Sequence, residues 1–303
     1  MNTQANAMPE SFGSQETPPV YSTGTRPMYW SVRRELWENR YVYAAPLAVA
    51  AITLFGFLIA TIGRALSVSN LSQRRLILHE PYTFAMDVIM GAAFIVGIFY
   101  SLDALHGERR DRSILFWKSL PVSDLTTVLS KAAIPLVVLP LLTFAIVLVM
   151  QLLMLILSSV TLLGSNLSAA ALWTRESPLQ MSFLLLYHMV TVHVLWYAPI
   201  YAWMLLVSAW AKRATFLWAA LPPVAICILE KITFNTSHFA AWLAYRASGA
   251  QEAIVPPGRM PMDSMTHLTP GHFLMNPGLW MGLLFAAGLL AAAVRLRRYQ
   301  GPI

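Results

Sequence analysis

Residues 100–131 read YSLDALHGERRDRSILFWKSLPVSDLTTVLSK, and the rest of the chain is arranged around this stretch. The stretch begins at the end of one apolar run of membrane length and stops where the next such run begins. It is the longest polar interval between strongly apolar runs that is also rich in basic residues. The pattern predicts two membrane helices joined by a basic loop at one face of a bilayer.

The centre of this loop has the pattern of a short amphipathic helix. Asp111 is placed to cap the start of this helix, and Pro121 is placed to end it. Ser123 and Asp124 then offer an N-cap for a new helix that continues into the next apolar run. The apolar side of the short helix consists of Ile114, Leu115, Phe116, Trp117 and Leu120.

The composition indicates a membrane protein. The chain has 303 residues, of which 57% are hydrophobic and 12% are charged, and its mean hydropathy is +0.58. A soluble domain carries roughly 25% charged residues. The net charge of +7 is explained by basic residues flanking membrane spans, so we expect no nucleic-acid partner.

Six apolar segments approach the roughly 20 residues that a helix needs to cross a bilayer. We therefore expect an all-α membrane protein with six transmembrane helices, which together make up a domain over residues 42–303. The predicted spans are 43–63, 84–105, 132–158, 182–209, 215–232 and 277–294.

The N-terminal region divides into two parts. Residues 1–27 are polar, lack the apolar core of a signal peptide, and are expected to form a disordered cytoplasmic tail. Residues 28–41 predict an amphipathic helix lying in the membrane interface. Its apolar face is formed by Tyr29, Trp30, Leu36 and Trp37.

The distribution of Lys and Arg predicts the orientation. With the N-terminus inside, 14 of these residues flank spans on the inner side and 7 lie on the outer side. This bias predicts that both termini are cytoplasmic, although Arg64, Arg74 and Arg75 argue against it. The loop at 106–131 is then cytoplasmic, and residues 233–276 form an outer segment that is either re-entrant or a cap.

Motifs for chemistry on this chain are absent. No phosphate-binding loop, zinc-protease HExxH or G-x-S-x-G motif occurs, and the single Cys227 excludes an internal disulfide. His188 and His193 are five residues apart, a poor spacing for a shared helix face. We therefore expect no catalytic residue, no metal site and no cofactor bound by this chain.

Charged residues inside or at the ends of spans leave two roles open. A carboxylate at the centre of a membrane costs about 2.5–3.5 kcal/mol on insertion scales, and less near an interface. Such residues either line a polar pathway or pair between helices, or they reach the interface and are structural. They are Asp87, Asp103, Glu230 and Lys231.

Three features occur together in the loop: the pair Glu108-Arg109, the short helix followed by SLPVS at 119–123, and Lys131 opening the next span. This combination resembles the ABC-2 type permeases, the membrane subunits of ABC exporters. The segment Asp111-Arg112-Ser113 departs mildly from the Gly-Thr that is frequent there in the family. Six spans, an interfacial N-terminal helix and an outer insertion before the last span are also similar.

The resemblance implies a permease subunit in the bacterial inner membrane that exports a hydrophobic or amphipathic substrate. It implies pairing with a second permease chain, contact with membrane lipid, and docking of two copies of an ABC ATPase subunit that carries ATP and Mg. Residues 111–119 would be the coupling helix. The residues implied to contact the ATPase are Glu108, Arg109, Arg110, Asp111, Arg112, Ile114, Phe116, Trp117 and Pro121.

Two other functions stay open on the sequence. The first is an ion- or proton-coupled carrier with Asp87 or Glu230 as the coupling site. The second is an integral membrane enzyme that uses His188 or His193. A dependence of transport on ATP, rather than on an ion gradient, distinguishes the permease from the carrier.

Overall fold

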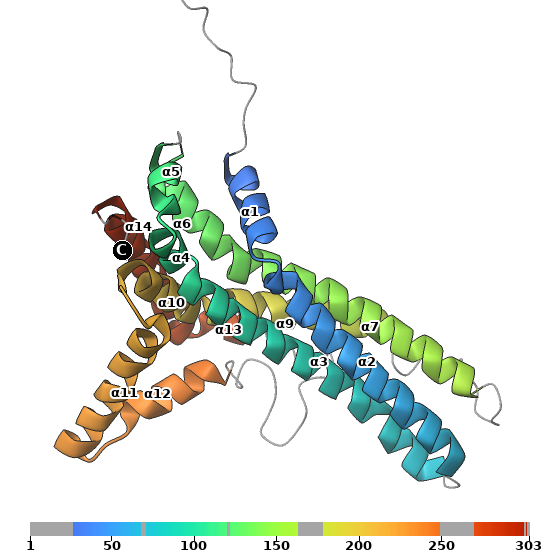
Figure 1. Cartoon of the computed structure of the whole chain (residues 1–303). Coiled ribbons are helices and arrows are strands. Elements are labelled where there is room, and N and C mark those ends of the chain that lie inside the picture. The colour runs from blue at the N-terminus through green and yellow to red at the C-terminus, as the bar shows by residue number, and fades with distance from the viewer. Residues whose placement is uncertain are drawn as a thin grey trace, which may run out of the picture.

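The computed structural model describes residues 27–67, 71–119, 122–162, 178–248, 270–299 and 301. Within these ranges the regular structure is entirely helical (Figure 1). The predicted tail at 1–27 and the second half of the outer segment lie mostly outside the described residues. The helices are α1 (Pro27–Glu38), α2 (Tyr41–Ser67), α3 (Leu71–Asp103), α4 (His106–Arg110), α5 (Ser113–Ser119), α6 (Asp124–Ala133), η1 (Ile134–Val138), α7 (Leu139–Leu162), α9 (Pro178–His188), η2 (Met189–Trp196), α10 (Ala198–Trp210), α11 (Thr215–Phe234), α12 (His238–Ala247), α13 (Pro270–Met275) and α14 (Pro277–Tyr299).

Helices long and apolar enough to cross a membrane lie at each of the predicted spans. In the described residues there are five such helices, and six if the bent pair Met181–Trp196 and Ala198–Trp210 counts as one span. The two halves of that pair meet at an angle of 44°. The five others are Tyr41–Thr61, Phe84–Arg110, Asp124–Val160, Thr215–Phe234 and Pro277–Tyr299. The prediction of an all-α chain with membrane-length helices is thus confirmed.

Several helices are longer than the apolar runs predicted. Helix α3 begins at Leu71, well before the predicted span at 84, because Gln, Arg and Leu are good helix formers and continue the helix past the apolar residues. Helix α14 continues to Tyr299 instead of ending at 294. This extension brings Arg297 to Asp124, the first residue of α6.

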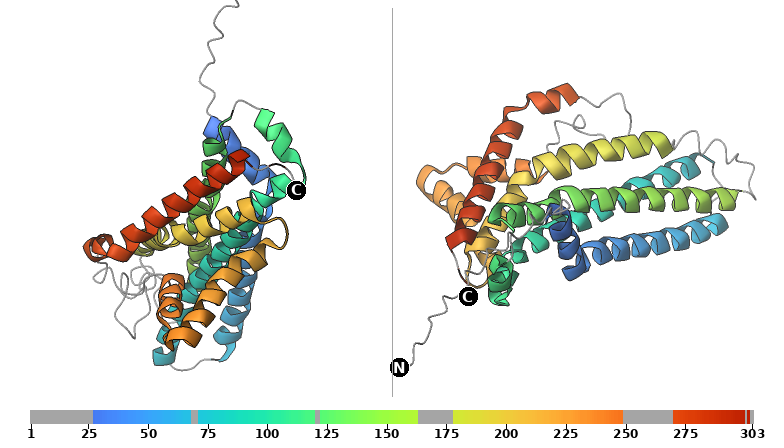
Figure 2. Two further views of the ribbon diagram at one scale, coloured as in Figure 1. Left: turned by 90° about the vertical axis from the view of Figure 1, so that its left-hand side faces the viewer. Right: turned by 90° about the horizontal axis from the view of Figure 1, so that it is seen from above.

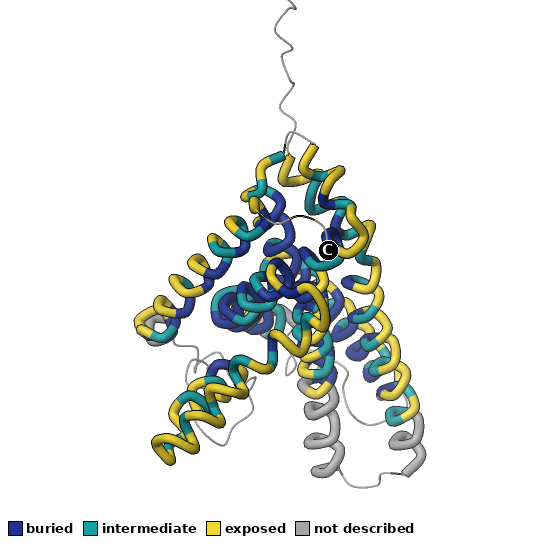
Figure 3. The backbone as a smooth tube through the Cα atoms, turned by 60° about the vertical axis from the view of Figure 1, so that its left-hand side comes forward, coloured by how far each residue is buried: buried dark blue, intermediate teal, exposed yellow. Residues whose placement is uncertain are grey.

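Helices α2, α3, α7 and α9 run side by side, while α10 crosses between α3 and α14 (Figures 1 and 2). Helix α11 leaves this body and α12 folds back beside it, so the pair forms a separate arm (Figure 1). Of the residues of α11, only Ala219 is buried, and the arm is largely exposed in Figure 3. Helices α1, α4, α5 and α6 lie in the upper part of Figure 1, at the end opposite the tips of α2 and α7.

Prolines inside spans are accommodated by neighbouring groups. Pro223 has no N–H to donate to the carbonyl of Ala219, four residues earlier. The Trp203 indole Nε1 on α10 donates to that carbonyl instead, at 3.1 Å. The first half of the third span contains Pro135 within the π-helical segment η1. The Trp203 contact shows how a neighbouring helix can satisfy a carbonyl that a proline leaves without a donor.

A close approach fixes α10 on α3. A Cβ at Gly97 would lie 2.8 Å from Cε1 of Tyr201, a side chain that is 1% exposed. Only a residue without a side chain therefore lets α10 pack at this distance. Ser101, one turn further along α3, is also buried and donates to the Gly97 carbonyl at 2.7 Å.

The sequence HFAAWLAYRA, in the first half of the outer segment, forms the short helix α12. The carboxyl end of α12 docks at the break between η2 and α10. Trp196 donates from Nε1 to the Arg246 carbonyl at 3.0 Å, and the Arg246 guanidinium lies 4.3 Å from the centre of the Trp196 ring. Gly282 on α14 leaves room for this guanidinium, since a Cβ there would collide with it.

Candidate functional site: the α4–α5 loop and its charge cluster

The loop between α3 and α6 contains two short helices instead of the single helix predicted. Helix α4 ends at Asp111, whose backbone N–H donates to the Gly107 carbonyl at 2.9 Å. Arg112 then adopts a left-handed conformation with φ of 58° and turns the chain into α5. The Asp111 side chain accepts a hydrogen bond from Arg110 at 3.1 Å. The prediction that Asp111 caps the loop helix was therefore wrong, because Asp111 terminates α4.

The predicted cap of the following helix is confirmed. Ser123 is the N-cap of α6, and its hydroxyl accepts the backbone N–H of Thr126 at 3.1 Å. Asp124 occupies the first turn of α6, where its negative charge is favourable. Pro121, predicted to end the loop helix, lies outside the described residues.

Helix α5 has one face held by the chain and one face free. Ile114 is 1% exposed and anchors the helix, whereas Leu115 and Phe116 are 59% and 60% exposed. Trp117 lies under the guanidinium of Arg34 on α1, at 3.7 Å from the ring centre. Four of the five apolar residues predicted on this helix therefore divide into an inner pair and an outer pair. The fifth, Leu120, lies outside the described residues.

Six charged residues lie together beneath α5, and we call them the charge cluster. They come from four helices, α1, α4, α6 and α14, and they form ion pairs with one another. The residues are Arg34, Glu35, Glu108, Asp124, Lys131 and Arg297.

Glu35 is the most deeply buried acid of this cluster. It is 1% exposed and pairs with Lys131 at 2.9 Å and with Arg34 at 2.6 Å. Its second carboxylate oxygen accepts the hydroxyl of Tyr100 on α3 at 2.8 Å. One side chain of α1 therefore joins α3 and α6.

Glu108 joins the loop to the same cluster. It lies 3.2 Å from Lys131 and 3.2 Å from Arg34, and it pairs with Arg297 of α14 at 3.0 Å. Arg297 in turn pairs with Asp124 at the start of α6. The three acids and three bases thus neutralise one another in a region from which water is largely excluded.

Arg109 fixes α4 to the end of α10. Its Nη1 donates to the carbonyls of Ala209 and Ala211, at 2.6 and 3.3 Å. The hydroxyl of Ser208 accepts the backbone N–H groups of Leu105 and His106, at 3.0 and 2.9 Å. Carbonyls at the end of α10 and amides at the start of α4 are therefore satisfied by side chains.

The electrostatics favour the charged forms in the cluster. Burial alone raises the pKa of Glu35, but the positive charges of Lys131 and Arg34 outweigh this effect and hold the pKa below its usual range. Burial likewise lowers the pKa of Arg34, and the carboxylates of Glu35 and Glu108 outweigh it and raise the pKa. Glu35 and Arg34 are thus both held in their charged forms.

Seven of the nine residues implied to contact an ATPase fall into two groups, while Trp117 is half-buried and Pro121 lies outside the described residues. Glu108, Arg109 and Ile114 are buried in the chain. Arg110, Asp111, Arg112 and Phe116 are exposed, and Arg110 lies 3.8 Å from the exposed Asp103. The exposed group is the part that is open to a partner, and the buried group holds it in place.

Glu230 has a structural partner at the turn between α11 and α12. Its carboxylate accepts the backbone N–H groups of His238 and Phe239 at 2.7 and 2.8 Å, and the Thr236 hydroxyl at 2.8 Å. It thereby satisfies free amides at the start of α12. The neighbouring Lys231 is exposed. Asp87 is also exposed, on the outward face of α3.

The interfacial helix forms as α1, with one correction to its face. Tyr29, Trp30 and Trp37 are exposed, and Arg33 lies 4.8 Å from the Trp37 ring centre. Leu36, predicted on the same face, packs instead against the core beside Val42. Glu35 and Leu36 are neighbours on α1, and both side chains lie on the side of the helix that packs against the bundle.

Sequence reasoning missed the cluster itself. It placed Glu35 on the polar side of α1, treated Asp124 as a capping residue, and counted Arg297 only for orientation. A usable signal was present: acids and bases of opposite sign stand at the same ends of several predicted spans. Among the described residues, no group of three or more His, Cys, Asp and Glu side chains could hold a metal ion.

No family model matches the chain, and no curated protein or solved structure matches it either.

Proposed function

We propose that the chain is the transmembrane permease subunit of an ATP-driven ABC exporter, with ATP hydrolysis on a separate subunit. The resemblance of residues 100–131 to ABC-2 type permeases supports this function. The observation that carries the proposal is the position of α5. This helix, which is not part of any membrane-length helix, presents Leu115 and Phe116 to the outside.

A rigid mounting is what a coupling helix requires. A partner that pushes on α5 moves Trp117, which stacks on Arg34, and Glu108, which is paired with Lys131 and Arg297. Those residues belong to α1, α6 and α14. A rigid-body motion of an ATPase would therefore reach three helices of the bundle through charged contacts with short distances.

In the proposed orientation, the end of the bundle that carries α5 lies in the cytoplasm. Both α1 and the end of α14 lie at the end that carries α5, since Arg109 Nε donates to the Gly301 carbonyl and Lys118 to the Arg298 carbonyl, at 3.4 and 3.3 Å. A chain whose two ends lie on the same side of a membrane must cross it an even number of times. This favours counting the bent pair as the sixth span. The bacterial inner membrane follows from the family resemblance.

The proposed assembly contains a second permease chain and two ATPase subunits. ATP and Mg belong to the ATPase, and this chain binds neither. The exported substrate is hydrophobic or amphipathic, because the spans carry few charges. Glu230 is engaged with the start of α12, which removes one of the two carboxylates on which the alternative of an ion-coupled carrier depends.

The test is co-purification from the cells that naturally produce the chain. The tagged chain is solubilised in mild detergent, bound proteins are identified by mass spectrometry, and ATPase activity is measured. We expect a stoichiometric partner with a phosphate-binding loop. We also expect the double variant Leu115→Ala/Phe116→Ala to lose this partner while its melting temperature stays unchanged.

A matched control distinguishes docking from a general loss of apolar surface. Leu284 and Phe285 form another adjacent Leu-Phe pair, 74% and 54% exposed on the membrane-length helix α14. Leu284→Ala/Phe285→Ala should retain the ATPase. An active preparation without such a partner, or retention of the partner by the α5 variant, would overturn the proposal.

A further inference from the structure

Helix α1 has an inner face that is tied to the bundle and an outer face that the described part of the chain leaves uncovered. On the inner face, Glu35 is paired with Lys131, and Leu36 packs against the core. On the outer face, Trp30 and Trp37 are 56% and 68% exposed. An exposed face of this kind marks a site of interaction, and its charges indicate what it binds.

Arg33 lies in the middle of this outer face. Trp30 precedes it by three residues and Trp37 follows it by four, so the three side chains share one side of the helix. The guanidinium carbon of Arg33 lies 5.3 Å from the centre of the Trp30 ring and 4.8 Å from that of Trp37. The structure therefore places a base between two aromatic rings, on the face that the sequence pattern described as apolar.

The Arg33 guanidinium keeps its hydrogen-bond donors free. A ring contact uses the flat face of the group, while its N–H groups point outward in the plane. Arg33 is exposed, and no carboxylate or carbonyl among the described residues accepts a hydrogen bond from it. The two acids of α1 are engaged elsewhere, Glu35 with Lys131 and Glu38 with Arg34 at 3.6 Å. The positive charge of the outer face is thus uncompensated.

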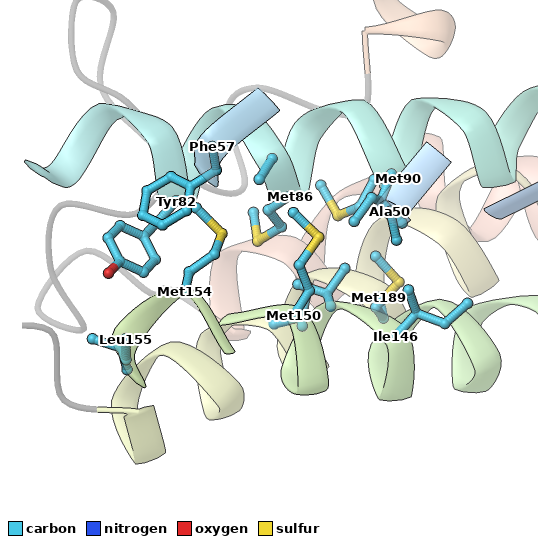
Figure 4. Packing of buried hydrophobic residues seen from close by; sticks show 14 residues of the cluster. Ala50, Phe57, Tyr82, Met86, Met90, Ile146, Met150, Met154, Leu155 and Met189 are labelled. Atoms are coloured by element: carbon cyan, nitrogen blue, oxygen red, sulfur yellow. The ribbon is translucent and has the colours of Figure 1, made fainter. Parts of the chain in front are cut away.

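This face lies where a membrane-length helix begins. The membrane-length part of α2 starts at Tyr41, four residues after Trp37. Ala50 and Phe57 of α2 are buried in the methionine-rich core that this helix shares with α3 and α7 (Figure 4). Helix α2 is therefore fixed in the bundle, and α1 stands at the level of the bilayer surface. Tryptophan is enriched at this level, because its ring is largely apolar and carries one polar N–H.

The chemistry of the face selects an anionic headgroup. An arginine fork binds a phosphate through two parallel hydrogen bonds, and a base near a membrane surface attracts anionic lipids. A zwitterionic headgroup brings a cation of its own, which reduces this attraction. We propose that Trp30, Arg33 and Trp37 bind the headgroup phosphate of an anionic phospholipid. The proposal goes beyond the transport function and does not depend on it.

The test measures lipid binding by the purified full-length chain in detergent, without an ATPase, so its outcome is separate from that of the proposed function. Two lipids with the same short acyl chains are compared: phosphatidylglycerol, which is anionic, and phosphatidylcholine, which is zwitterionic. Mass spectrometry of the intact protein counts the lipids retained at each concentration and gives an apparent affinity. We expect the first phosphatidylglycerol to bind about fivefold tighter than phosphatidylcholine, the ratio that attraction by one base gives.

Variants at exposed positions separate the site from a general effect of charge. Arg33→Gln should lower the affinity for phosphatidylglycerol about fivefold and leave that for phosphatidylcholine unchanged. Arg298→Gln removes an exposed arginine at the same end of the bundle and should leave both affinities unchanged. Trp30→Leu/Trp37→Leu should also weaken phosphatidylglycerol binding, because the guanidinium loses the rings that orient it. Melting temperatures should stay the same in all three variants.

Several results would overturn the assignment. They are equal affinities for the two lipids, an unchanged affinity for phosphatidylglycerol in Arg33→Gln or in the tryptophan variant, and an equal loss in Arg298→Gln. Displacement of phosphatidylglycerol by the same concentration of inorganic phosphate would show a site for a free anion instead. If Arg33→Gln keeps its lipid but loses a co-purifying protein, the face binds a protein and the proposal is wrong.

Discussion

Lys131 and Glu35 stand 96 residues apart in the chain and form an ion pair of 2.9 Å, with side chains only 2% and 1% exposed. The pair joins the short helix α1 to the start of the third membrane-length helix. Lys131 also lies 3.2 Å from Glu108, so one ammonium group balances two carboxylates from different parts of the chain. Several measurable properties depend on this arrangement.

Removing the ammonium should destabilise the protein strongly. Lys131→Met leaves Glu35 and Glu108 buried with less positive charge, and loss of one partner of a buried pair costs about 3–5 kcal/mol. We expect a large fall in the melting temperature of the detergent-solubilised chain. Lys212→Met, which changes an exposed lysine, is the control. Equal melting temperatures for the two variants would show that the pair of Lys131 and Glu35 does not stabilise the fold.

Lowering the pH should reduce the stability of the folded chain through protonation of Glu35. Its folded-state pKa lies below the ordinary value of 4.5, because the charges of Lys131 and Arg34 outweigh the effect of burial. The unfolded state therefore takes up a proton first, and stability present above pH 4.5 is lost as the pH falls toward the folded-state pKa.

The corresponding experiment compares the unmodified chain with Glu35→Gln. Melting temperatures are recorded from neutral pH down to below 4.5. The variant, which cannot titrate at this position, should be less stable at neutral pH and should lose less stability on acidification. Two curves of the same slope would contradict the role of Glu35.

Trp117 and Phe116 should differ sharply although they are neighbours. Trp117 lies under Arg34, and a cation–π contact contributes about 0.5–2 kcal/mol. Trp117→Ala should lower the melting temperature, and Trp117→Phe should lower it less. Phe116→Ala, at an exposed position, should leave it unchanged. A similar loss for Phe116→Ala would show that α5 is held on both faces.

The approach of Tyr201 to Gly97 predicts a severe effect of a single methyl group. Gly97→Ala forces the Tyr201 ring away from α3, and overpacking of a core costs about 1–3 kcal/mol. Gly91→Ala lies on the same helix with no atom within 4 Å of the added carbon, so it should be neutral. The free energy of unfolding of both variants tests this, and equal values would refute the close contact.

Glu230→Gln should loosen the arm formed by α11 and α12. The neutral amide accepts the amides of His238 and Phe239 less strongly than the carboxylate does. Hydrogen exchange in the first turn of α12 should therefore accelerate, while exchange in α3 stays the same. Lys231→Gln is the matched control at the next position. If it accelerates exchange equally, the capping role of Glu230 is wrong.

The membrane helices were predictable because their signal is local. A run of about 20 apolar residues has one stable solution in a bilayer, and the Ser123 cap lies directly before the helix that it starts. The predicted helix ends were less accurate. Helix α14 continues past 294 and α3 begins before 84, because residues that favour helix extend each helix beyond its apolar part.

The charge cluster was not predictable by the same reasoning. Glu35, Glu108 and Arg297 are far apart in the sequence, and only the packing of their helices decides that they meet. On α1, the helical pattern placed Glu35 with the other charged residues, away from the aromatic face. The π-helical segments likewise depend on packing between helices, and nothing in the local sequence of His193 reveals that its ring is buried.

The charge cluster is completed only late in the synthesis of the chain. Arg297 follows Asp124 by 173 residues, so a ribosome exposes the three acids, Arg34 and Lys131 long before it makes the last base. Until then the group carries one excess negative charge, and α6 has no partner on α14. Completion of the cluster thus reports that the final helix has inserted and reached its place. A chain interrupted before residue 297 would lack the base that pairs with both Glu108 and Asp124.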